Sequence, residues 1–458
     1  MERMTSMATP RNSAVVLVLG ASQKPLESQM AVAEQTRRKT GKTRNAAGAR
    51  KRNHKPIVLI SSYPPRLCGI GTFCEEAREF IQKENPSRDV LVIAHTDGRG
   101  KGVFPIIDMA RHDWWRPVVE KVRKLDPYAI HIEHEYGLYN YHDRRGRGDG
   151  NAGFLELLGQ LEPWPVVVEP HTVHGRLSDW EADFVYQMCS RADVVLLKCH
   201  YQKWRFDWTC TSFGWETPRN LMVVPHGARS DRRYRIDQVV ALRKELGLDT
   251  TLARHVVGLI GWIQNNKRWD ILTTMWEDIA QELLATTGKN WDLLAAGEMR
   301  DPAHKSDYEK YRGQVELLEK KKLAHFYEFT PRGVPYYKIM AICDFIVLPS
   351  IDETQSGTLA RIIALNKPYI TTTPMEGLTA QTIESGGGLM FTNREMLRAA
   401  VVRMATDRNL RMTLGNNLEK YLLNVVAWEV IVKEYTQAYR LANDAVRRKK
   451  KVDLPLEF

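Results

Sequence analysis

The sequence between residues 56 and 445 alternates apolar runs with amphipathic segments, and this alternation constrains the fold more than any other feature. The runs Ile57–Ser61, Val166–Glu169 and Phe345–Leu348 are mostly apolar and have the length of strands, as expected for strands buried on both faces. The segments between such runs have helical periodicity. Parallel strands need crossover connections, which are usually helices that cover the sheet. The pattern therefore predicts an α/β fold built on doubly wound parallel sheets.

The alternation occurs in two series, which predicts two Rossmann-like domains. The first series occupies residues 56–228 and the second residues 229–427, and the charged stretch 227–254 between them lacks a strand pattern. A final helix is expected at residues 428–446. Ligands of doubly wound sheets bind in the crevice at the carboxyl ends of the strands. The candidate site is therefore expected between the two domains.

Basic residues are concentrated at the two ends of the chain. The 458 residues carry a net charge of +11, with twelve Lys and Arg against three Glu in residues 1–55 and five consecutive cations at 447–451. We expect a disordered basic extension at residues 1–55 and a basic tail at 447–458. Such ends are candidates for electrostatic contact with a membrane surface or nucleic acid, and solubilising disordered tails are the alternative. The sequence carries no signal for an oligomeric state.

The cysteines and the amino-terminal region indicate the cellular compartment in which the protein is expected. None of the six Cys forms a Cys-x-x-Cys pair, which favours reduced thiols over a disulfide framework. Residues 14–19 form an apolar run that is too short for a signal-peptide core or a membrane span. Residues 35–55 have the composition of a transit segment, and a disordered extension explains them equally well. We therefore expect a soluble, cytoplasmic protein.

The segment 345–373 has the form of an anion site. A buried strand is followed by a polar loop, and a helix is expected to begin at about Ser356 and Gly357. The first N–H groups of a helix lack partners and its dipole favours negative charge, so phosphate binds well there. Glu353 stands in the loop, where a carboxylate would accept hydrogen bonds from a hydroxyl-rich group such as a sugar. These residues together indicate a nucleotide-sugar.

The Pro-Ser-x-x-Glu run that ends at Glu353, the small-residue helix and the Asn-Lys-Pro-Tyr-Ile run after it resemble the donor-binding segment of retaining glycosyltransferases of the GT-B fold, family 4. Glu353 matches the family's first Glu, which faces the donor sugar. The family has a second Glu that faces the nucleotide ribose, and Arg361 stands at that position. We expect Arg361 to donate to the diphosphate instead, because guanidinium suits phosphate oxygens. A helix-surface Arg is the alternative.

The resemblance extends to the other donor-binding segments. The first βα turn, Cys-Gly-Ile-Gly-Thr-Phe, is similar to the family loop that faces the diphosphate and the acceptor. After the strand at 256–260, Gly261 and Lys267 match a motif whose cations hold the diphosphate, whereas Trp262 replaces the expected Arg. The resemblance implies the following donor-binding residues: Gly69, Gly71, Gly261, Lys267, Arg268, Ser356, Gly357, Thr358 and Arg361.

Histidines that follow strands of the first domain complete the candidate site. In the family a His at the position of His171 lies close to the donor sugar, so the resemblance implies that His171 and Glu353 are the catalytic residues. The segment 134–137, His-Glu-Tyr-Gly, is similar to one in a subset of the family. His134 and Glu135, together with His174, would then contact the acceptor. A hydrogen-bonded loop is the alternative role for this segment.

The implied reaction moves a hexose from a nucleoside diphosphate sugar to a hydroxyl of a glycan or small-molecule acceptor, with retention of anomeric configuration. GDP-mannose and UDP-glucose are both family donors, so mannosyl transfer in polysaccharide biosynthesis fits the resemblance. No cofactor is expected besides the donor substrate. The sequence has no Asp-x-Asp and no His or Cys cluster with zinc spacing, which predicts metal-independent neutralisation of the phosphates by cations and helix ends. The run from Ala427 to Arg440 resembles the family helix that crosses back to the first domain.

Three alternatives compete with a glycosyltransferase. The first is another GT-B enzyme, such as a sugar-nucleotide epimerase or a phosphorylase. The second is a catalytically inactive protein that binds nucleotide-sugar or glycan, which Arg361 and Trp262 favour because they replace family residues. The third is a nucleic-acid-binding protein that uses the basic ends.

Overall fold

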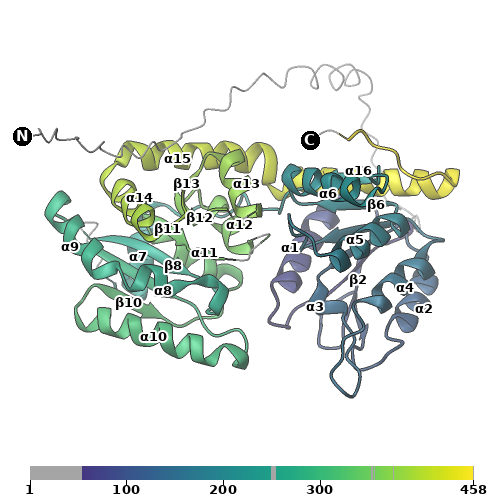
Figure 1. Ribbon diagram of the computed structural model, residues 1–458, viewed down its shortest axis with the longest axis horizontal. Coiled ribbons are helices and arrows are strands. Elements are labelled where there is room, and N and C mark those ends of the chain that lie inside the picture. The colour runs from purple at the N-terminus through teal and green to yellow at the C-terminus, as the bar shows by residue number, and fades with distance from the viewer. Residues whose placement is uncertain (1–53, 249–253, 352–353, 355, 375, 457–458) are drawn as a thin grey trace, which may run out of the picture. The chain divides into compact units, whose positions relative to one another are not determined.

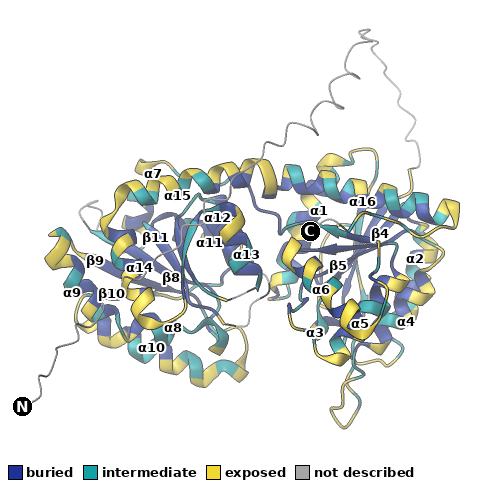
Figure 2. Cartoon of the chain, turned by 45° about the horizontal axis from the view of Figure 1, so that its top comes forward, coloured by how far each residue is buried: buried dark blue, intermediate teal, exposed yellow. Residues whose placement is uncertain are grey.

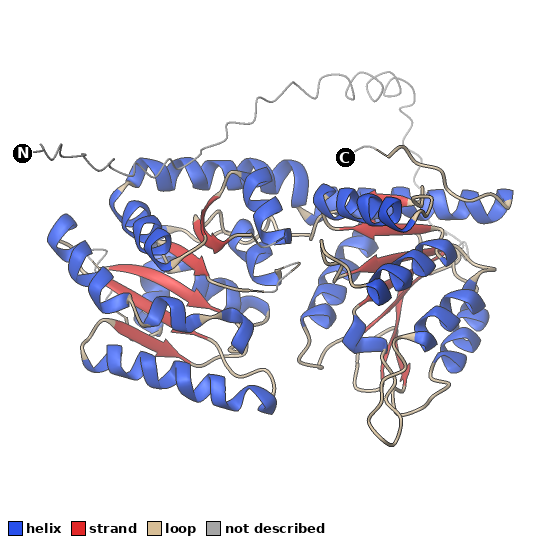
Figure 3. Cartoon of the chain, viewed as in Figure 1, coloured by secondary structure: helices blue, strands red, loops and turns tan. Residues whose placement is uncertain are grey.

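The computed structural model describes residues 54–248, 254–351, 354, 356–374 and 376–456, which belong to one compact unit of the chain. Within these residues the strands form two parallel sheets, and helices cover both of them (Figure 1; Figure 3). The fold class predicted from the alternation of strands and helices is confirmed: the chain is α/β with two Rossmann-like sheets.

The first sheet has seven strands among the described residues, in the order β3-β2-β1-β4-β5-β6-β7, and all its pairings are parallel. Its strands are β1 (Ile57–Ser61), β2 (Val90–His95), β3 (Val103–Ile107), β4 (Ala129–His134), β5 (Val166–Pro170), β6 (Val194–Leu197) and β7 (Leu221–Val223). The helices of this part are α1 (Gly69–Glu84), α2 (Trp115–Leu125), α3 (Tyr136–Tyr139), α4 (Ala152–Leu161), α5 (Asp179–Arg191) and α6 (His200–Phe213).

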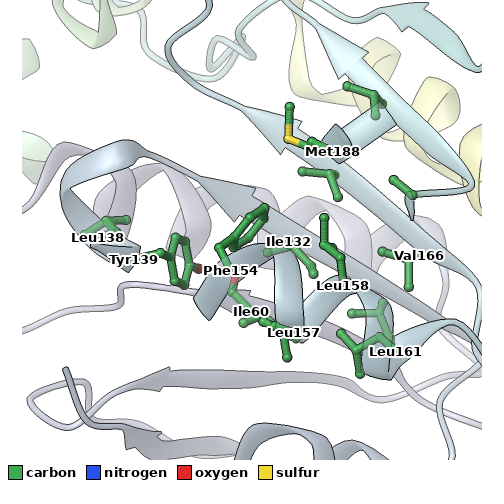
Figure 4. Packing of buried hydrophobic residues seen from close by; sticks show 14 of the residues in the cluster. Ile60, Ile132, Leu138, Tyr139, Phe154, Leu157, Leu158, Leu161, Val166 and Met188 are labelled. Atoms are coloured by element: carbon green, nitrogen blue, oxygen red, sulfur yellow. Dashed lines mark hydrogen bonds between the residues drawn. The ribbon is translucent and has the colours of Figure 1, made fainter. Parts of the chain in front are cut away.

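The central strands are buried on both faces, as expected for a parallel sheet that helices cover on both sides. Every residue of β1 and β4 is buried. Figure 4 shows the core on one face, where Ile60 and Ile132 of the sheet pack with Leu157 of α4. The buried hydroxyl of Tyr139 donates to the carbonyl oxygens of Ile60 and Glu133, at 3.3 and 3.2 Å. The short helix α3 is thereby fixed at the carboxyl ends of β1 and β4.

The second sheet has six strands in the described part of the chain, in the order β10-β9-β8-β11-β12-β13. Its strands are β8 (His255–Ile260), β9 (Trp291–Ala296), β10 (Ala324–Tyr327), β11 (Phe345–Leu348), β12 (Tyr369–Thr372) and β13 (Gly388–Phe391). The helices of this part are α7 (Ile236–Glu245), the 3-10 helices η2 (Asn265–Lys267) and η3 (Pro302–His304), α8 (Trp269–Thr273), α9 (Trp276–Thr287), α10 (Lys305–Lys320), α11 (Gly333–Ala341), α12 (Gly357–Ala364), α13 (Glu376–Ser385), α14 (Arg394–Thr406) and α15 (Arg408–Tyr421).

The last helix returns from the second sheet to the first. A π-helix, η4 (Leu422–Val426), leads into α16 (Trp428–Arg448). Trp428 and Tyr435 of α16 are buried in a core together with residues of α1 and the first sheet. Gly227 leaves room for this helix, because a Cβ there would lie 2.5 Å from a ring carbon of Trp428. The chain therefore has the crossover helix that the family resemblance implied.

Two strands were not expected from the sequence, and both lie at sheet edges. β3 contains Pro105 and is mostly half-buried, and β13 is half-buried over most of its length. Edge strands tolerate proline and lack neighbours on one side. Their sequences, Val-Phe-Pro-Ile-Ile and Gly-Leu-Met-Phe, are apolar, but they contain a proline or begin with glycine, residues that are more typical of loops than of strands.

The carboxyl-terminal segment 449–456 lies against the first part of the fold. The backbone N–H of Leu454 donates to Arg219 O at 2.7 Å, and Arg219 Nε donates to Leu454 O at 3.0 Å. Lys203 Nζ donates to Pro455 O at 3.1 Å. A disordered tail is therefore wrong for residues 449–456. The expected amino-terminal extension lies outside the described residues, except for residues 54 and 55.

Candidate functional site

Residues from both sheets line one cavity of about 210 Å³. The first sheet contributes the amino-terminal end of α1 and the loops after β4, β5 and β7, and the second contributes the loop after β8 and the start of α12. These loops follow the carboxyl ends of parallel strands, where doubly wound folds bind ligands. Seven of the predicted site residues line the cavity: Gly69, Glu135, His171, Lys267, Gly357, Thr358 and Arg361.

The amino-terminal end of α12 faces this cavity through Gly357 and Thr358. Ser356 caps the helix, because its side chain accepts a hydrogen bond from the backbone N–H of Leu359 at 3.3 Å. The hydroxyl groups of Tyr336 and Thr358 lie 2.7 Å apart and fix the first turn. The helix start predicted from the sequence is confirmed, and Ser356 contributes to it as a cap. Glu353 lies outside the described residues.

Arg361 is buried one turn into α12, so the helix-surface role considered for it is wrong. Its Nη1 donates to Gly357 O at 2.7 Å, and its Nη2 lies 3.7 Å from Glu76 Oε1. The guanidinium also lies over the rings of Tyr336 and Tyr337. Its Nε is buried and has no hydrogen-bond partner among the described residues. Arg361 therefore brings a positive charge to the lining of the cavity.

Cations outnumber carboxylates around this cavity in the described part of the chain. Lys267, Arg300, Arg332 and Arg361 line it, against Glu76 and Glu135. Arg300 and Arg332 are exposed, and Arg332 Nη1 donates to Pro65 O at 3.3 Å. An excess of one sign of charge around a site attracts ligands of the opposite sign. The cavity is therefore suited to an anion.

Besides the capping residue Ser356, three predicted donor residues lie away from the lining. Arg268 has a φ of 48° and donates from its Nε to Asp270 Oδ1 at 3.1 Å. Gly71 is buried inside α1 against Ser62 and Tyr63. Gly261, whose φ of 145° requires a glycine, lines a neighbouring space of about 10 Å³ together with Lys267. The structure thus gives Gly71 and Gly261 backbone roles and pairs Arg268 with a carboxylate.

His171 directly follows β5, and its imidazole lies beside the buried carboxylate of Glu133. Its Nε2 lies 3.4 Å from Glu133 Oε2, which also accepts a hydrogen bond from Ser61 Oγ at 3.4 Å. The ring of Phe73 meets the imidazole edge-on, with the centroids 4.8 Å apart. Because Nε2 is turned toward the interior, Nδ1 is the ring nitrogen left to meet a ligand.

His226 lines the cavity but is not among the site residues predicted from the sequence. Its Nδ1 lies 2.9 Å from Gly227 O, and a carbonyl oxygen only accepts, so Nδ1 carries the proton. Burial holds the pKa of His226 well below its usual value, which keeps the ring neutral. Nε2 is then an acceptor on the side of Gly357. The signal that could have identified it is the Pro-His-Gly run, residues 225–227, after β7.

The three predicted acceptor residues have different surroundings. Glu135 lines the cavity and accepts hydrogen bonds from Tyr136 N and Thr172 Oγ1, at 3.1 and 2.6 Å. His134 is buried behind it, with Nε2 3.2 Å from Asn151 Oδ1, and burial lowers its pKa to about 3. His174 Nδ1 lies 2.8 Å from Glu181 Oε1 at the start of α5. Glu135 is therefore the one of the three that the structure brings to the cavity.

A larger cavity of about 800 Å³ opens on another side of α1. It is lined by charged residues that include Glu79 and Arg229. Arg229 Nη1 already donates to Glu79 Oε2 at 2.8 Å, and its Nη2 donates to Asp231 Oδ2 at 2.9 Å. The candidate residues lie instead around the smaller cavity at the strand ends.

The described residues contain no group of three or more His, Cys, Asp or Glu that could hold a metal ion. All six cysteines are buried and free.

In the described ranges, no helix is both long enough and apolar enough to cross a membrane.

Two parallel Rossmann-like sheets, a cavity at their strand ends and a crossover helix define the GT-B class of fold. Residues 254–407, which span the second sheet, match the family model described as Glycosyl transferases group 1. Comparison with curated proteins gave no match.

Several solved structures share the fold. HepE of Anabaena, in complex with UDP-glucose, is 15% identical with a TM-score of 0.62, over 84% of this chain and 99% of HepE. Sucrose-phosphate synthase of Thermosynechococcus elongatus is 17% identical with a TM-score of 0.60, over 85% of this chain and 100% of the synthase. WaaG, a glycosyltransferase involved in lipopolysaccharide biosynthesis, is 13% identical with a TM-score of 0.54, over 86% of this chain and 99% of WaaG.

Proposed function

We propose that the protein transfers a hexosyl group from a nucleoside diphosphate sugar to a hydroxyl of a glycan or small-molecule acceptor, with retention and without a metal ion. The observation that carries this proposal is the composition of the 210 Å³ cavity. Cations and a helix amino-terminus suit a diphosphate, and the acceptors beside them suit the hydroxyl groups of a sugar. The group 1 family match and the UDP-glucose complex of HepE agree with such a ligand.

The diphosphate would lie between Lys267, Arg361 and the first turn of α12. As the bond between the sugar and the phosphate oxygen breaks, negative charge develops on the leaving group. Preorganised cations and N–H dipoles stabilise this charge in the transition state. Arg300 and Arg332 at the edge of the cavity would add long-range attraction for the donor.

The sugar would lie on the side of His171 and His226. Nδ1 of His171 and Nε2 of His226 would contact sugar hydroxyls, together with Glu353. The acceptor hydroxyl, oriented by Glu135, would attack the anomeric carbon on the face that the diphosphate leaves. The new carbon–oxygen bond forms as the old one breaks, and a leaving phosphate oxygen takes the acceptor proton. Attack from that face retains the configuration.

Binding of a nucleotide-sugar without transfer is the second candidate function. It is favoured by Arg361, which stands where the resembling family has a Glu and which is buried against Glu76. The two functions differ in the fate of the donor, because a pure binding protein would return it unchanged.

The first test is a thermal-shift screen of the full chain against UDP-, GDP- and ADP-sugars, with EDTA and then with magnesium. We expect one donor to raise the melting temperature in EDTA, and Lys267→Ala to abolish the shift. Lys320→Ala is the matched control, because Lys320 is exposed on α10 away from the cavity. A screen without any shift would contradict the proposal, and a shift that needs magnesium would contradict metal independence.

A further inference from the structure

Two buried carboxylates lie on neighbouring strands of the first sheet. Glu133 of β4 and Glu169 of β5 are paired in register, and both have an exposed fraction of 0%. Figure 2 shows β4 and β5 in the dark blue of buried residues. A carboxylate that is removed from water needs a cation or hydrogen-bond donors to offset the loss of hydration. The two carboxylates differ in how far their surroundings meet this requirement.

Glu169 has donors on both of its carboxylate oxygens. The ammonium group of Lys198 donates to Oε1, and the hydroxyl of Tyr435 on α16 lies 2.9 Å from both oxygens. Nε2 of His131 lies 2.8 Å from Oε2, and Nδ1 lies 2.9 Å from the hydroxyl of Tyr439. Burial lowers the pKa of His131 to about 4, so the neutral ring donates from Nε2 to Glu169 and accepts from Tyr439. The charge of Glu169 is therefore compensated within the core.

Glu133 has fewer donors among the described residues. Its Oε2 accepts a hydrogen bond from Ser61 Oγ at 3.4 Å, and its Oε1 has no hydrogen-bond partner there. Cys74 lies nearby as a neutral thiol, because burial and the charge of Glu133 raise the pKa of this thiol, and a thiol is a weak donor. Nε2 of His171 lies 3.4 Å from Oε2 and is also buried without a hydrogen-bond partner in the described part of the chain. The imidazole therefore lies where it can supply the donor that Glu133 needs.

The contact with Glu133 decides which nitrogen of a neutral His171 carries the proton. A carboxylate only accepts hydrogen bonds, and a neutral imidazole has one N–H and one acceptor nitrogen. With the proton on Nε2, the ring donates to Glu133. With the proton on Nδ1, two lone pairs would face each other away from water, which costs free energy. The distance of 3.4 Å is long for a hydrogen bond, and contacts between catalytic groups often shorten when a ligand binds.

We propose that Glu133 is a positioning residue, which holds the proton of His171 on Nε2 so that Nδ1 accepts a hydrogen bond from a hydroxyl group of the ligand. That this hydroxyl belongs to the transferred sugar rests on the proposed function. Ionised phosphate oxygens only accept hydrogen bonds, so an acceptor nitrogen disfavours them at this place. Glu133 therefore makes the His171 side of the cavity selective for hydroxyl groups over phosphate.

His226 presents a second acceptor nitrogen on the same side of the cavity. Its Nδ1 donates to Gly227 O at 2.9 Å, which leaves Nε2 without a proton. The rings of His171 and His226 both contact Phe73, with centroid distances of 4.8 and 4.6 Å. Each acceptor nitrogen needs a donor from the ligand, so this pair of rings suits a group with more than one hydroxyl.

The first test is long-range proton–nitrogen correlation NMR of the full chain, labelled in its histidines, in mildly alkaline buffer where free histidine is neutral. We expect His171, assigned from the signals that His171→Gln removes, to carry its proton on Nε2. This proton should resonate far downfield, because it is hydrogen-bonded to a carboxylate, and Glu133→Gln should shift it upfield or remove it. A wild-type His171 with its proton on Nδ1, or the same downfield proton in folded Glu133→Gln, would overturn the proposal.

Turnover of deoxy donors supplies the second test. Glu133→Gln should lower kcat/KM for the complete donor about tenfold, because the Gln amide can donate to Nε2 and so allows the proton to move to Nδ1. The wild type should use the donor that lacks the hydroxyl bonded by His171 less well than the complete donor, and Glu133→Gln should reduce this difference. A loss of folded protein would not change the ratio of the two rates. A variant with the wild-type ratio would overturn the proposal.

Asp344→Asn is the matched control. It removes a carboxylate whose Oδ1 lies 2.9 Å from Nδ1 of His255, in the second sheet and outside the lining of the cavity. This variant should leave both the His171 signals and the discrimination between donors unchanged. If no donor is turned over, the proposed function fails, and the NMR signals still decide whether Glu133 holds the proton of His171.

Discussion

The Arg361 guanidinium lies 3.7 Å from the Glu76 carboxylate, and this pair joins α12 of the second sheet to α1 of the first. Trp428 Nε1 donates to Glu76 Oε2 at 3.2 Å, so the crossover helix meets the same carboxylate. Both members of the pair are largely buried, with exposed side-chain fractions of 10% and 14%. An anion bound at the start of α12 would become a second partner of Arg361. The pair therefore connects the candidate donor site to the contact between the two sheets.

Arg361→Gln should weaken donor binding at least tenfold, because a charged donor to the diphosphate is lost. The free energy of unfolding should fall by about 1–3 kcal/mol, because Glu76 loses its cation. Isothermal calorimetry and urea unfolding measure the two effects. A double-mutant cycle that combines Arg361→Gln with Glu76→Gln should give a coupling free energy of at least about 0.5 kcal/mol between the two side chains. If the Arg361→Gln variant binds the donor as tightly as the wild type, Arg361 does not contact the donor.

His226→Phe should lower kcat/KM up to about tenfold, because it removes one hydrogen-bond acceptor while a ring still packs on Phe73. The Phe73 and His226 rings lie 4.6 Å apart in the wild type. A panel of deoxy donors identifies the sugar hydroxyl that His226 Nε2 contacts. The wild type should have a lower kcat/KM for the donor that lacks this hydroxyl, whereas the variant should use that donor as well as the complete one. His112→Phe, at an exposed position, is the control. If the His226→Phe variant still discriminates against the same deoxy donor as strongly as the wild type, Nε2 of His226 contacts no donor hydroxyl.

The central strands and the start of α12 could be predicted because their signals are local. Continuous apolar runs marked β1 and β11, and the Ser-Gly pair marked the capped helix start. The edge strand β3 is also apolar, but Pro105 in its middle argues against a strand, because proline is confined to edge strands and loops.

The environments of the site residues could not be read from the sequence. Nothing local to Arg361 shows that Glu76, which is far away in the chain, lies beside it. His134 and Glu135 are neighbours in sequence, yet one is buried behind the strand and the other lines the cavity. His226 was missed because its role depends on a hydrogen bond to the next carbonyl group. Such features depend on tertiary packing, and a motif records only residue type and order.

Gly227→Ala should lower the free energy of unfolding by about 1–3 kcal/mol, because the added methyl would overlap the buried Trp428 ring. The ideal Cβ position lies 2.5 Å from Trp428 Cδ2. Gly159→Ala on α4 is the matched control, since its Cβ would have no heavy atom within 4 Å. There the substitution should be neutral or stabilising, because alanine favours helix. Urea unfolding of both variants measures the difference, and equal stability would argue against close packing of α16 on Gly227.

The stability of the fold should decrease in mild acid because His95 is buried as a neutral ring. Burial lowers its pKa to about 4, and its Nε2 has no hydrogen-bond partner in the part of the chain that the structure describes. The unfolded chain binds a proton at His95 below about pH 6.5, whereas the folded chain resists until about pH 4. The stability that neutral His95 contributes is therefore complete above pH 6.5 and is lost as the pH falls from about 6.5 to about 4.

The contribution of His95 should be about 2 kcal/mol between pH 7 and pH 5. Urea unfolding at the two pH values measures it. His95→Gln is expected to lower stability at pH 7 but to reduce the pH dependence by about this amount. If the variant and the wild type lose the same free energy between pH 7 and pH 5, His95 does not titrate as its burial requires.

The most direct test of the proposed function is a transfer assay with the donor that binds, a panel of glycan and small-molecule acceptors, and proton NMR of the product in EDTA. We predict a new glycoside with the anomeric configuration of the donor, released together with the nucleoside diphosphate. Lys267→Ala should abolish its formation and Lys320→Ala should not. A donor that binds but is returned unchanged with every acceptor would show a binding protein, and a product of inverted configuration would contradict the retaining mechanism.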